Sequence, residues 1–181
     1  MKKLAIVIGH TDSAKGARLT YPFEFIQEYE YNTILAGLIK MYGLDFGKLD
    51  IKIFLRDGKG IVRTYDEVER WQADLSIELH FNSFSGNAEG STVLYGSIPR
   101  SNLLAEMANE NINMVMENRD RGAKFIGISE RGGMNVNSGQ VPRILIEPFF
   151  GSDFEDARRG LLQIHELAKA LLKTAVDFLY R

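Results

Sequence analysis

Short apolar runs separated by longer segments of helical periodicity constrain the fold of this sequence more than any other feature. The runs are rich in Ile, Val and Leu and are bounded by Gly, Asp, Ser or Pro, which is typical of buried strands. They cover Leu4–Ile8, Ile51–Leu55, Leu75–Leu79, Thr92–Tyr95 and Ile144–Glu147. Strands that alternate with helices predict an α/β fold, with a mostly parallel central sheet and helices on both faces.

Four helical segments lie between or after these runs. The pattern predicts helices over Glu28–Tyr42, Thr64–Ala73 and Asn102–Asn118, and a last helix that begins at an N-cap, Ser152, and runs to the end of the chain. Glu155, three residues after Ser152, completes a capping box. The first helix is expected to bury one apolar face, made by Tyr31, Ile34, Leu35, Leu38 and Met41.

Length and composition predict one domain over residues 1–181. A chain of 181 residues can bury a single well-sized core, and it shows no internal repeat, low-complexity tract or linker. The net charge of −2 gives no sign of a nucleic-acid partner. The chain has no cysteine, which excludes disulfides, thiol catalysis and thiolate metal ligands.

The amino-terminal segment superficially resembles the start of a signal peptide. Two lysines precede the apolar run Leu4–Ile8, which is five residues long. A signal peptide needs an apolar stretch of roughly 7–15 residues, and a membrane span needs about 20. We therefore expect a buried first strand, no transmembrane segment, and a protein made in the cytoplasm without an export signal of its own.

Two of the three histidines directly follow predicted strands. His10 follows Leu4–Ile8, and His80 follows Leu75–Leu79. The carboxyl ends of parallel strands meet at one edge of a sheet, where ligands bind. The two histidines are therefore candidates for a shared metal, although a single histidine near a strand end is more often a hydrogen-bonded structural residue. His165 lies within the last predicted helix, where a residue at the boundary of the core is the better interpretation.

A third candidate ligand stands at the start of the first predicted helix. Catalytic zinc takes three protein ligands from His, Glu or Asp and keeps one position open. Glu28 is placed where its carboxylate can point back over the strand ends, and Glu24 and Glu30 compete for this role. Acidic residues at helix starts also suit the helix dipole, so position alone does not decide among the three.

Glu147 ends the last apolar run. A carboxylate at the end of a core strand is unfavourable unless it is paired, bound to metal or located at the open edge of the sheet. One interpretation is a general base or acid for metal-assisted hydrolysis. The alternative is an ion pair with an arginine, such as Arg143 or Arg131.

The motifs, taken in order, resemble one family over nearly the whole chain. They are Gly9-His10, Gly16-Ala17, Glu28 with Asn32, Arg56-Asp57, Arg70 with Asp74, His80-Phe81-Asn82, Arg121-Gly122-Ala123-Lys124, and Pro142 to Glu147 followed by Phe150. This set resembles the zinc-dependent N-acetylmuramoyl-L-alanine amidases of bacterial cell-wall enzymes and phage endolysins. The spacing from glutamate to asparagine in that family selects Glu28 over its neighbours.

The resemblance implies a function and a set of roles. His10, Glu28 and His80 would bind Zn²⁺, and Glu147 would be catalytic. The substrate would be peptidoglycan, cut at the amide bond between N-acetylmuramic acid and L-alanine. Arg121 is a candidate for binding a substrate carboxylate, with a structural ion pair as an equal alternative. The expected absence of an export signal and of a wall-binding domain favours a phage or prophage endolysin that reaches the cell wall after holin-type release.

Two other functions fit the same residues. A zinc peptidase that cuts elsewhere in the stem peptide would use the same metal chemistry. A non-catalytic wall-binding module would keep the fold, but it would have no need of all four residues His10, Glu28, His80 and Glu147.

Glu78 departs from the family pattern, which usually has a small residue two positions before the second histidine. Strand alternation places Glu78 on the same face as Ser76 and His80. Two interpretations are open: a partner of a metal-ligating histidine, or a solvated or ion-paired carboxylate. The polar segment Glu130–Gln140, just before a predicted strand, is expected to be a loop of the kind that often lines a site.

Overall fold

The computed structural model describes residues 1–181 apart from the side chain of Phe46. In the part of the chain so described, six strands form one sheet in the order β2-β1-β3-β6-β4-β5. β1 pairs in parallel with β2 and β3, β3 with β6, and β4 with β5, while β4 is antiparallel to β6. The strands are β1 (Lys2–Ile8), β2 (Leu49–Phe54), β3 (Leu75–Leu79), β4 (Ser91–Tyr95), β5 (Asp120–Phe125) and β6 (Arg143–Glu147).

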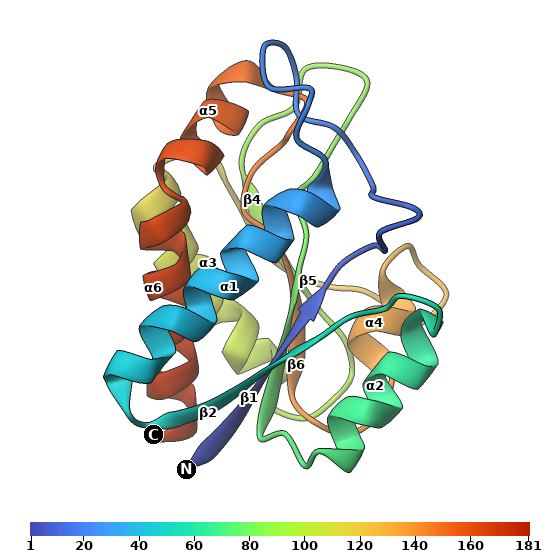
Figure 1. Ribbon diagram of the computed structural model, residues 1–181, viewed down its shortest axis with the longest axis vertical. Helices are drawn as coiled ribbons and strands as arrows, with labels where there is room; N and C mark the ends of the chain where they lie inside the picture. Colours follow the sequence, from blue (N-terminus) through green and yellow to red (C-terminus); the bar gives the residue numbers. More distant parts are fainter.

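The predicted mostly parallel sheet with helices on both faces is confirmed. Figure 1 shows α1, α3 and α6 on one side of the sheet and α2 and α4 on the other, with both termini at the lower end of the view. Among the described residues, no helix has the length and apolar character needed to cross a membrane. The helices are α1 (Glu28–Phe46), α2 (Gly60–Arg70), α3 (Ser101–Met116), α4 (Gly133–Asn137), α5 (Phe154–Leu162) and α6 (Ile164–Leu179).

The register of the central strands brings the candidate site residues to one edge. Ile8 of β1 pairs with Leu79 of β3, and Leu79 pairs with Ile146 of β6. The residues after these three positions therefore leave the sheet at the same edge, as the sequence predicted for His10, His80 and Glu147.

Alternating side chains divide the buried residues between the two faces of the sheet. The face under α1, α3 and α6 is a large apolar core that includes Leu4, Ile6 and Ile8 of β1 and Leu75, Ile77 and Leu79 of β3. The face under α2 is a smaller cluster made by Ala5, Val7, Phe54, Tyr65, Val68, Ala73 and Val141.

The buried face of α1 differs from the prediction. Tyr31, Leu35 and Ile39 are buried as part of the core, whereas Ile34 and Met41 are exposed. Hydrophobicity alone misplaced this face because the helix turns two polar residues inward along the same stripe: Glu28 and Asn32 are both buried. This orientation aims Glu28 at the edge of the sheet.

The prediction of the last helix is wrong in two respects: the residue at which the helix begins, and its extension to the end of the chain without a break. The N-cap is Asp153, whose side chain accepts a hydrogen bond from the Asp156 backbone N–H at 2.9 Å. Ser152 instead accepts a hydrogen bond from the Phe84 backbone N–H. The helix is also interrupted at Gln163, so that α5 and α6 are separate elements.

Two elements were not predicted. β5 is an edge strand whose residues are all exposed or only partly buried, so that it has no apolar run to reveal it. The segment expected to be a loop, Glu130–Gln140, contains the short helix α4. Asn135 and Val136 of α4 are buried against the sheet face that also carries α2.

Candidate metal centre and catalytic carboxylate

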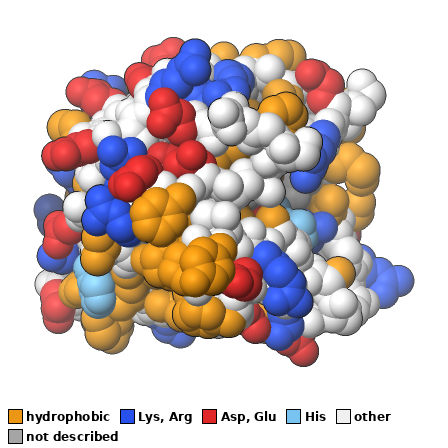
Figure 2. All heavy atoms as spheres, turned by 90° about the horizontal axis from the view of Figure 1, so that it is seen from above, with side chains coloured by type: hydrophobic (Ala, Val, Ile, Leu, Met, Phe, Trp, Pro, Cys, Tyr) orange, Lys and Arg blue, Asp and Glu red, His pale blue; other side chains and the backbone are white. Residues whose placement is uncertain are grey.

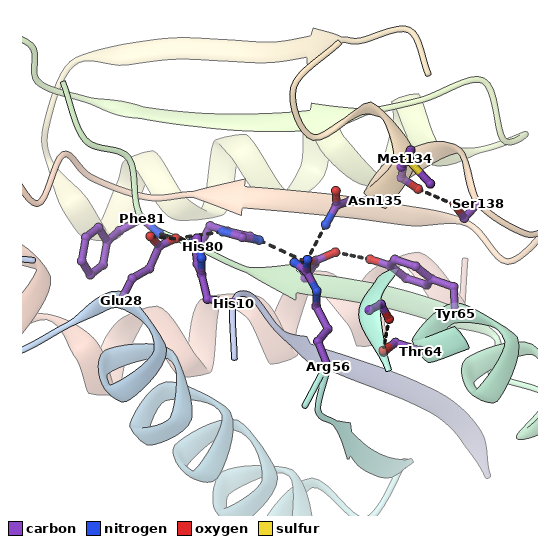
Figure 3. Close-up of polar contacts among 12 residues, drawn as sticks. His10, Glu28, Arg56, Thr64, Tyr65, His80, Phe81, Met134, Asn135 and Ser138 are labelled. Atoms are coloured by element: carbon purple, nitrogen blue, oxygen red, sulfur yellow. Dashed lines mark hydrogen bonds and ion pairs between the residues drawn. The ribbon is translucent and has the colours of Figure 1, made fainter. Parts of the chain in front are cut away.

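His10, Glu28 and His80 come together from three separate elements. His10 follows β1, Glu28 opens α1, and His80 follows β3. One oxygen of Glu28, Oε2, lies 3.0 Å from His10 Nε2, and the other, Oε1, lies 2.8 Å from His80 Nδ1. One potential ligand atom from each residue lies within 4.8 Å of the others, and Figure 3 shows the three side chains converging. Two imidazoles and a carboxylate match the donor set of catalytic zinc.

Two glycines leave the space in which these side chains meet. A Cβ on Gly9 would lie 2.4 Å from the His80 ring. A Cβ on Gly16 would lie 2.6 Å from Glu28 Oε2 and 2.7 Å from His10 Cδ2, and Gly16 has a φ of +79° that favours glycine. His10 itself has a φ of 66°, a conformation that non-glycine residues seldom adopt and that concentrates at functional sites.

The charges of the cluster are strongly coupled. Burial alone would raise the pKa of Glu28, but hydrogen bonds with His10 and His80 outweigh it and hold this pKa at about 2. Burial alone would lower the pKa of His80, but hydrogen bonds with the carboxylates of Glu28 and Glu78 raise it to about 9. Without metal, the imidazole of His80 therefore holds its proton tightly between the carboxylates of Glu28 and Glu78. The same negative charges favour a metal cation at this position.

The competing acidic residues have other positions. Glu30 binds Lys15 Nζ at 2.9 Å and accepts a hydrogen bond from the Gln27 backbone N–H, so it serves the start of α1. Glu24 is exposed. His165 lies on α6, where its Nδ1 is 2.8 Å from the hydroxyl of Tyr42, and it is not part of the His–Glu–His group.

Glu147 faces the same pocket from the end of β6. Its Oε2 accepts a hydrogen bond of 2.8 Å from the Asn82 side chain. Burial raises the pKa of Glu147 above its usual value, which makes its carboxylate a stronger base than that of an exposed glutamate. Arg143, one proposed partner, binds Glu69 at 2.8 Å instead.

The pocket at this edge has a volume of about 530 Å³. Figure 2 looks down on this end of the molecule and shows a histidine surface within a hollow flanked by Lys and Arg side chains. Asn82 and Arg131 line the pocket and were not assigned from the sequence. Asn82 belongs to the His-x-Asn motif, which was a usable signal, whereas nothing in the polar segment distinguished Arg131 from its neighbours.

Arg121 lies apart from this pocket. Its guanidinium is 5.1 Å from the centre of the Phe150 ring, and its Nη1 is 3.4 Å from the Glu89 carbonyl oxygen. Among the described residues, it does not line the pocket. A role in substrate binding stays a prediction.

A family model identifies the family of this chain. Residues 4–174 match the family model described as N-acetylmuramoyl-L-alanine amidase. No curated protein matches the chain by sequence.

Solved structures share the fold over nearly the full length of this chain. The catalytic domain of the amidase CwlV from Bacillus (Paenibacillus) polymyxa has a TM-score of 0.86 at 17% identity, covering 99% of this chain and 98% of that one. An N-acetylmuramoyl-L-alanine amidase from Clostridium difficile has a TM-score of 0.83 at 19% identity, covering 98% and 96%. The catalytic domain of CD27L endolysin, targeting Clostridia difficile, has a TM-score of 0.72 at 26% identity and covers 98% of both chains.

Proposed function

Because this chain belongs to the N-acetylmuramoyl-L-alanine amidase family, we propose that residues 1–181 form a single catalytic domain that hydrolyses the bond between N-acetylmuramic acid and L-alanine in peptidoglycan with the help of zinc. The observation that supports zinc is the His10–Glu28–His80 cluster, whose ligand atoms lie within 4.8 Å of one another. Glu147 lines the same pocket as this cluster.

The residues of the cluster have separable tasks. His10, Glu28 and His80 would hold the metal, which when bound lowers the pKa of water and polarises a carbonyl group. Glu28 is only 4% exposed to solvent. Its buried negative charge favours binding of a cation at the cluster over binding of a neutral ligand. Gly9 and Gly16 keep the space around the three ligands free of side chains.

Glu147 is the residue to which we assign proton transfer. It would take a proton from the attacking water as the new carbon–oxygen bond forms, and deliver it to the amine of L-alanine as the carbon–nitrogen bond breaks. Asn82 holds Oε2 of this carboxylate, and we assign the transfer to the other oxygen. The raised pKa of Glu147 makes its carboxylate a stronger base than an exposed glutamate, which favours the first step, proton uptake from the attacking water.

We also propose that the chain acts on the cell wall as a phage or prophage endolysin, reaching its substrate after holin-type release. The likeness to the catalytic domain of CD27L endolysin, over 98% of both chains, supports this setting.

Digestion of purified peptidoglycan tests the proposed bond. Mass spectrometry is expected to find stem peptides with a new free L-alanine amine, together with glycan strands whose muramic acid carries no peptide. New amines on other residues, without free L-alanine, would instead indicate a stem peptidase. No release from several wall chemotypes, despite bound zinc, would indicate a non-catalytic wall-binding module.

A further inference from the structure

Glu78 is a charged residue buried in the sheet, immediately behind the candidate metal centre. It lies on β3, two residues before His80, with an exposed fraction of 0%. Its side chain points to the face of the sheet that carries α2 and α4, opposite to the apolar core. A carboxylate in such a place is very unfavourable unless it is paired and its oxygens are hydrogen-bonded.

Four donors surround this carboxylate. Arg56 Nη1 lies 3.1 Å from Oε1, and Asn135 Nδ2 donates to the same oxygen at 2.7 Å. The hydroxyl of Tyr65 donates to Oε2. His80 Nε2 lies 3.1 Å from Oε1. These groups come from the loop after β2, from α4, from α2 and from the end of β3, and Figure 3 shows Arg56, Asn135 and Tyr65 converging there.

A carboxylate fixed in this way selects the tautomer of the neighbouring imidazole. An ionised carboxylate accepts hydrogen bonds and donates none, so His80 must carry a hydrogen on Nε2 to bind Glu78. In the neutral ring, the free lone pair is then on Nδ1. Nδ1 is the nitrogen that lies 2.8 Å from Glu28 Oε1, inside the His10–Glu28–His80 cluster.

We propose that Glu78 is a positioning residue for the metal centre. It accepts the hydrogen bond from His80 Nε2, orients the ring with Nδ1 toward the site, and makes this nitrogen a stronger ligand. This inference rests on the proposed function, because it presumes that zinc binds His10, Glu28 and His80. Partners of this kind typically change metal affinity by 10–100-fold.

The same contacts are compatible with a purely structural role, in which Glu78 only stabilises the packing of α2 and α4 on the sheet. Tyr65→Phe separates the two roles. This variant removes one hydrogen bond to Glu78 and changes little else, while the contact between Glu78 and His80 is kept. A structural role predicts that Tyr65→Phe and Glu78→Gln affect the metal centre alike.

Zinc affinity, measured by competition with a chromophoric chelator near pH 7, gives the first readout. We expect Glu78→Met, which has no acceptor for Nε2–H, to weaken zinc binding about 10–100-fold. Glu78→Gln keeps a neutral acceptor and should fall between Glu78→Met and the wild type. Tyr65→Phe should stay close to the wild type. Equal affinity in all four proteins would overturn the positioning role.

Nitrogen-15 spectra of the histidine rings give a second readout, the ring nitrogen that carries the hydrogen, which does not depend on the stability of the fold. With zinc bound, His80 should carry its hydrogen on Nε2, with slow exchange that Tyr65→Phe keeps and Glu78→Gln weakens. The signals that disappear in the variant His165→Ala belong to His165, which assigns one of the three histidine rings. A hydrogen on Nδ1 in the zinc-loaded wild type would overturn the inference even if Glu78→Met fails to fold. A folded wild type that binds no zinc would overturn the proposed function and this inference together.

Discussion

The two faces of the central sheet are stabilised by different forces. The face under α1, α3 and α6 is filled with apolar side chains from β1, β3 and three helices. The face under α2 and α4 buries charge: Glu78 and Arg143 are both fully buried there. Arg143 binds Glu69 and lies 4.1 Å from the centre of the Tyr65 ring, whose hydroxyl in turn binds Glu78.

The difference indicates a division of labour between fold and site. Apolar burial is roughly proportional to area and has no direction, so it stabilises a fold without fixing single atoms. Buried hydrogen-bonded charges are directional and contribute little net stability, but they hold groups in one geometry. His80 lies where the two faces meet, with Glu28 from α1 on one side and Glu78 on the other.

The largest effect is expected at the end of β6, where Glu147 lines the pocket. Glu147→Gln is nearly isosteric, so zinc content and stability should be retained while kcat falls about 10²–10⁴-fold, the usual magnitude of general acid–base catalysis. Steady-state kinetics on zinc-loaded protein measures this. Retention of more than about a tenth of the wild-type kcat is incompatible with the assigned role.

The apolar face should respond in stability and leave the metal site intact. Leu171 on α6 is fully buried, and Leu171→Ala is expected to reduce the free energy of unfolding by about 2–5 kcal/mol. Zinc affinity of the folded variant should stay unchanged. Urea unfolding and chelator competition measure the two quantities. A large loss of zinc affinity in Leu171→Ala with little loss of stability would contradict the proposed difference between the two faces of the sheet.

The carboxylates on both sides of His80 should make the stability of the metal-free protein sensitive to pH. Carboxylates raise the pKa of His80 from 6.5 to about 9 in the folded state. The resulting stability is fully present below pH 6.5 and is lost as the pH rises through 9. At 1.36 kcal/mol per pKa unit, the loss is on the order of 3 kcal/mol. The lowered pKa values of Glu28 and Glu78, about 2, do not act in this window, because their contribution is lost only below pH 4.5.

Urea unfolding of chelator-treated protein at pH 6 and pH 9 measures this loss. Zinc-loaded protein is the control, because a metal-bound imidazole nitrogen has no proton to release. His80→Asn should abolish most of the difference between the two pH values in the chelator-treated protein. An equal loss of stability in the wild type and in His80→Asn would show that other groups are responsible.

The sequence predicted the apolar part of this comparison better than the polar part. The runs at β1, β3 and β6 are continuous and apolar, so their strands and their common edge could be inferred, and with them the meeting of His10, His80 and Glu147. β5 could not, because an exposed edge strand lacks that pattern. The break at Gln163 interrupts an apolar stripe that runs on through α6, so composition did not reveal it.

The surroundings of Glu78 were beyond sequence reasoning for a different reason. Tyr65 is 13 residues from Glu78 and Asn135 is 57 residues from it. Their meeting depends on how α2 and α4 pack on the sheet, and α4 lies in a segment whose composition indicates a loop. Strand alternation gave the correct face for Glu78 and left its role as an ion-paired residue or a histidine partner open. The structure contains both contacts.

Zinc content tests the central claim most directly. Elemental analysis of reconstituted protein should find about one zinc per chain in the wild type, as expected for three ligands of this type. Zinc should be retained in Glu147→Gln and His165→Ala and be lost in Glu28→Gln and His80→Ala, with helix content unchanged. Zinc well below one per chain in a folded wild type would contradict the assignment, and so would its loss in His165→Ala with retention in His80→Ala.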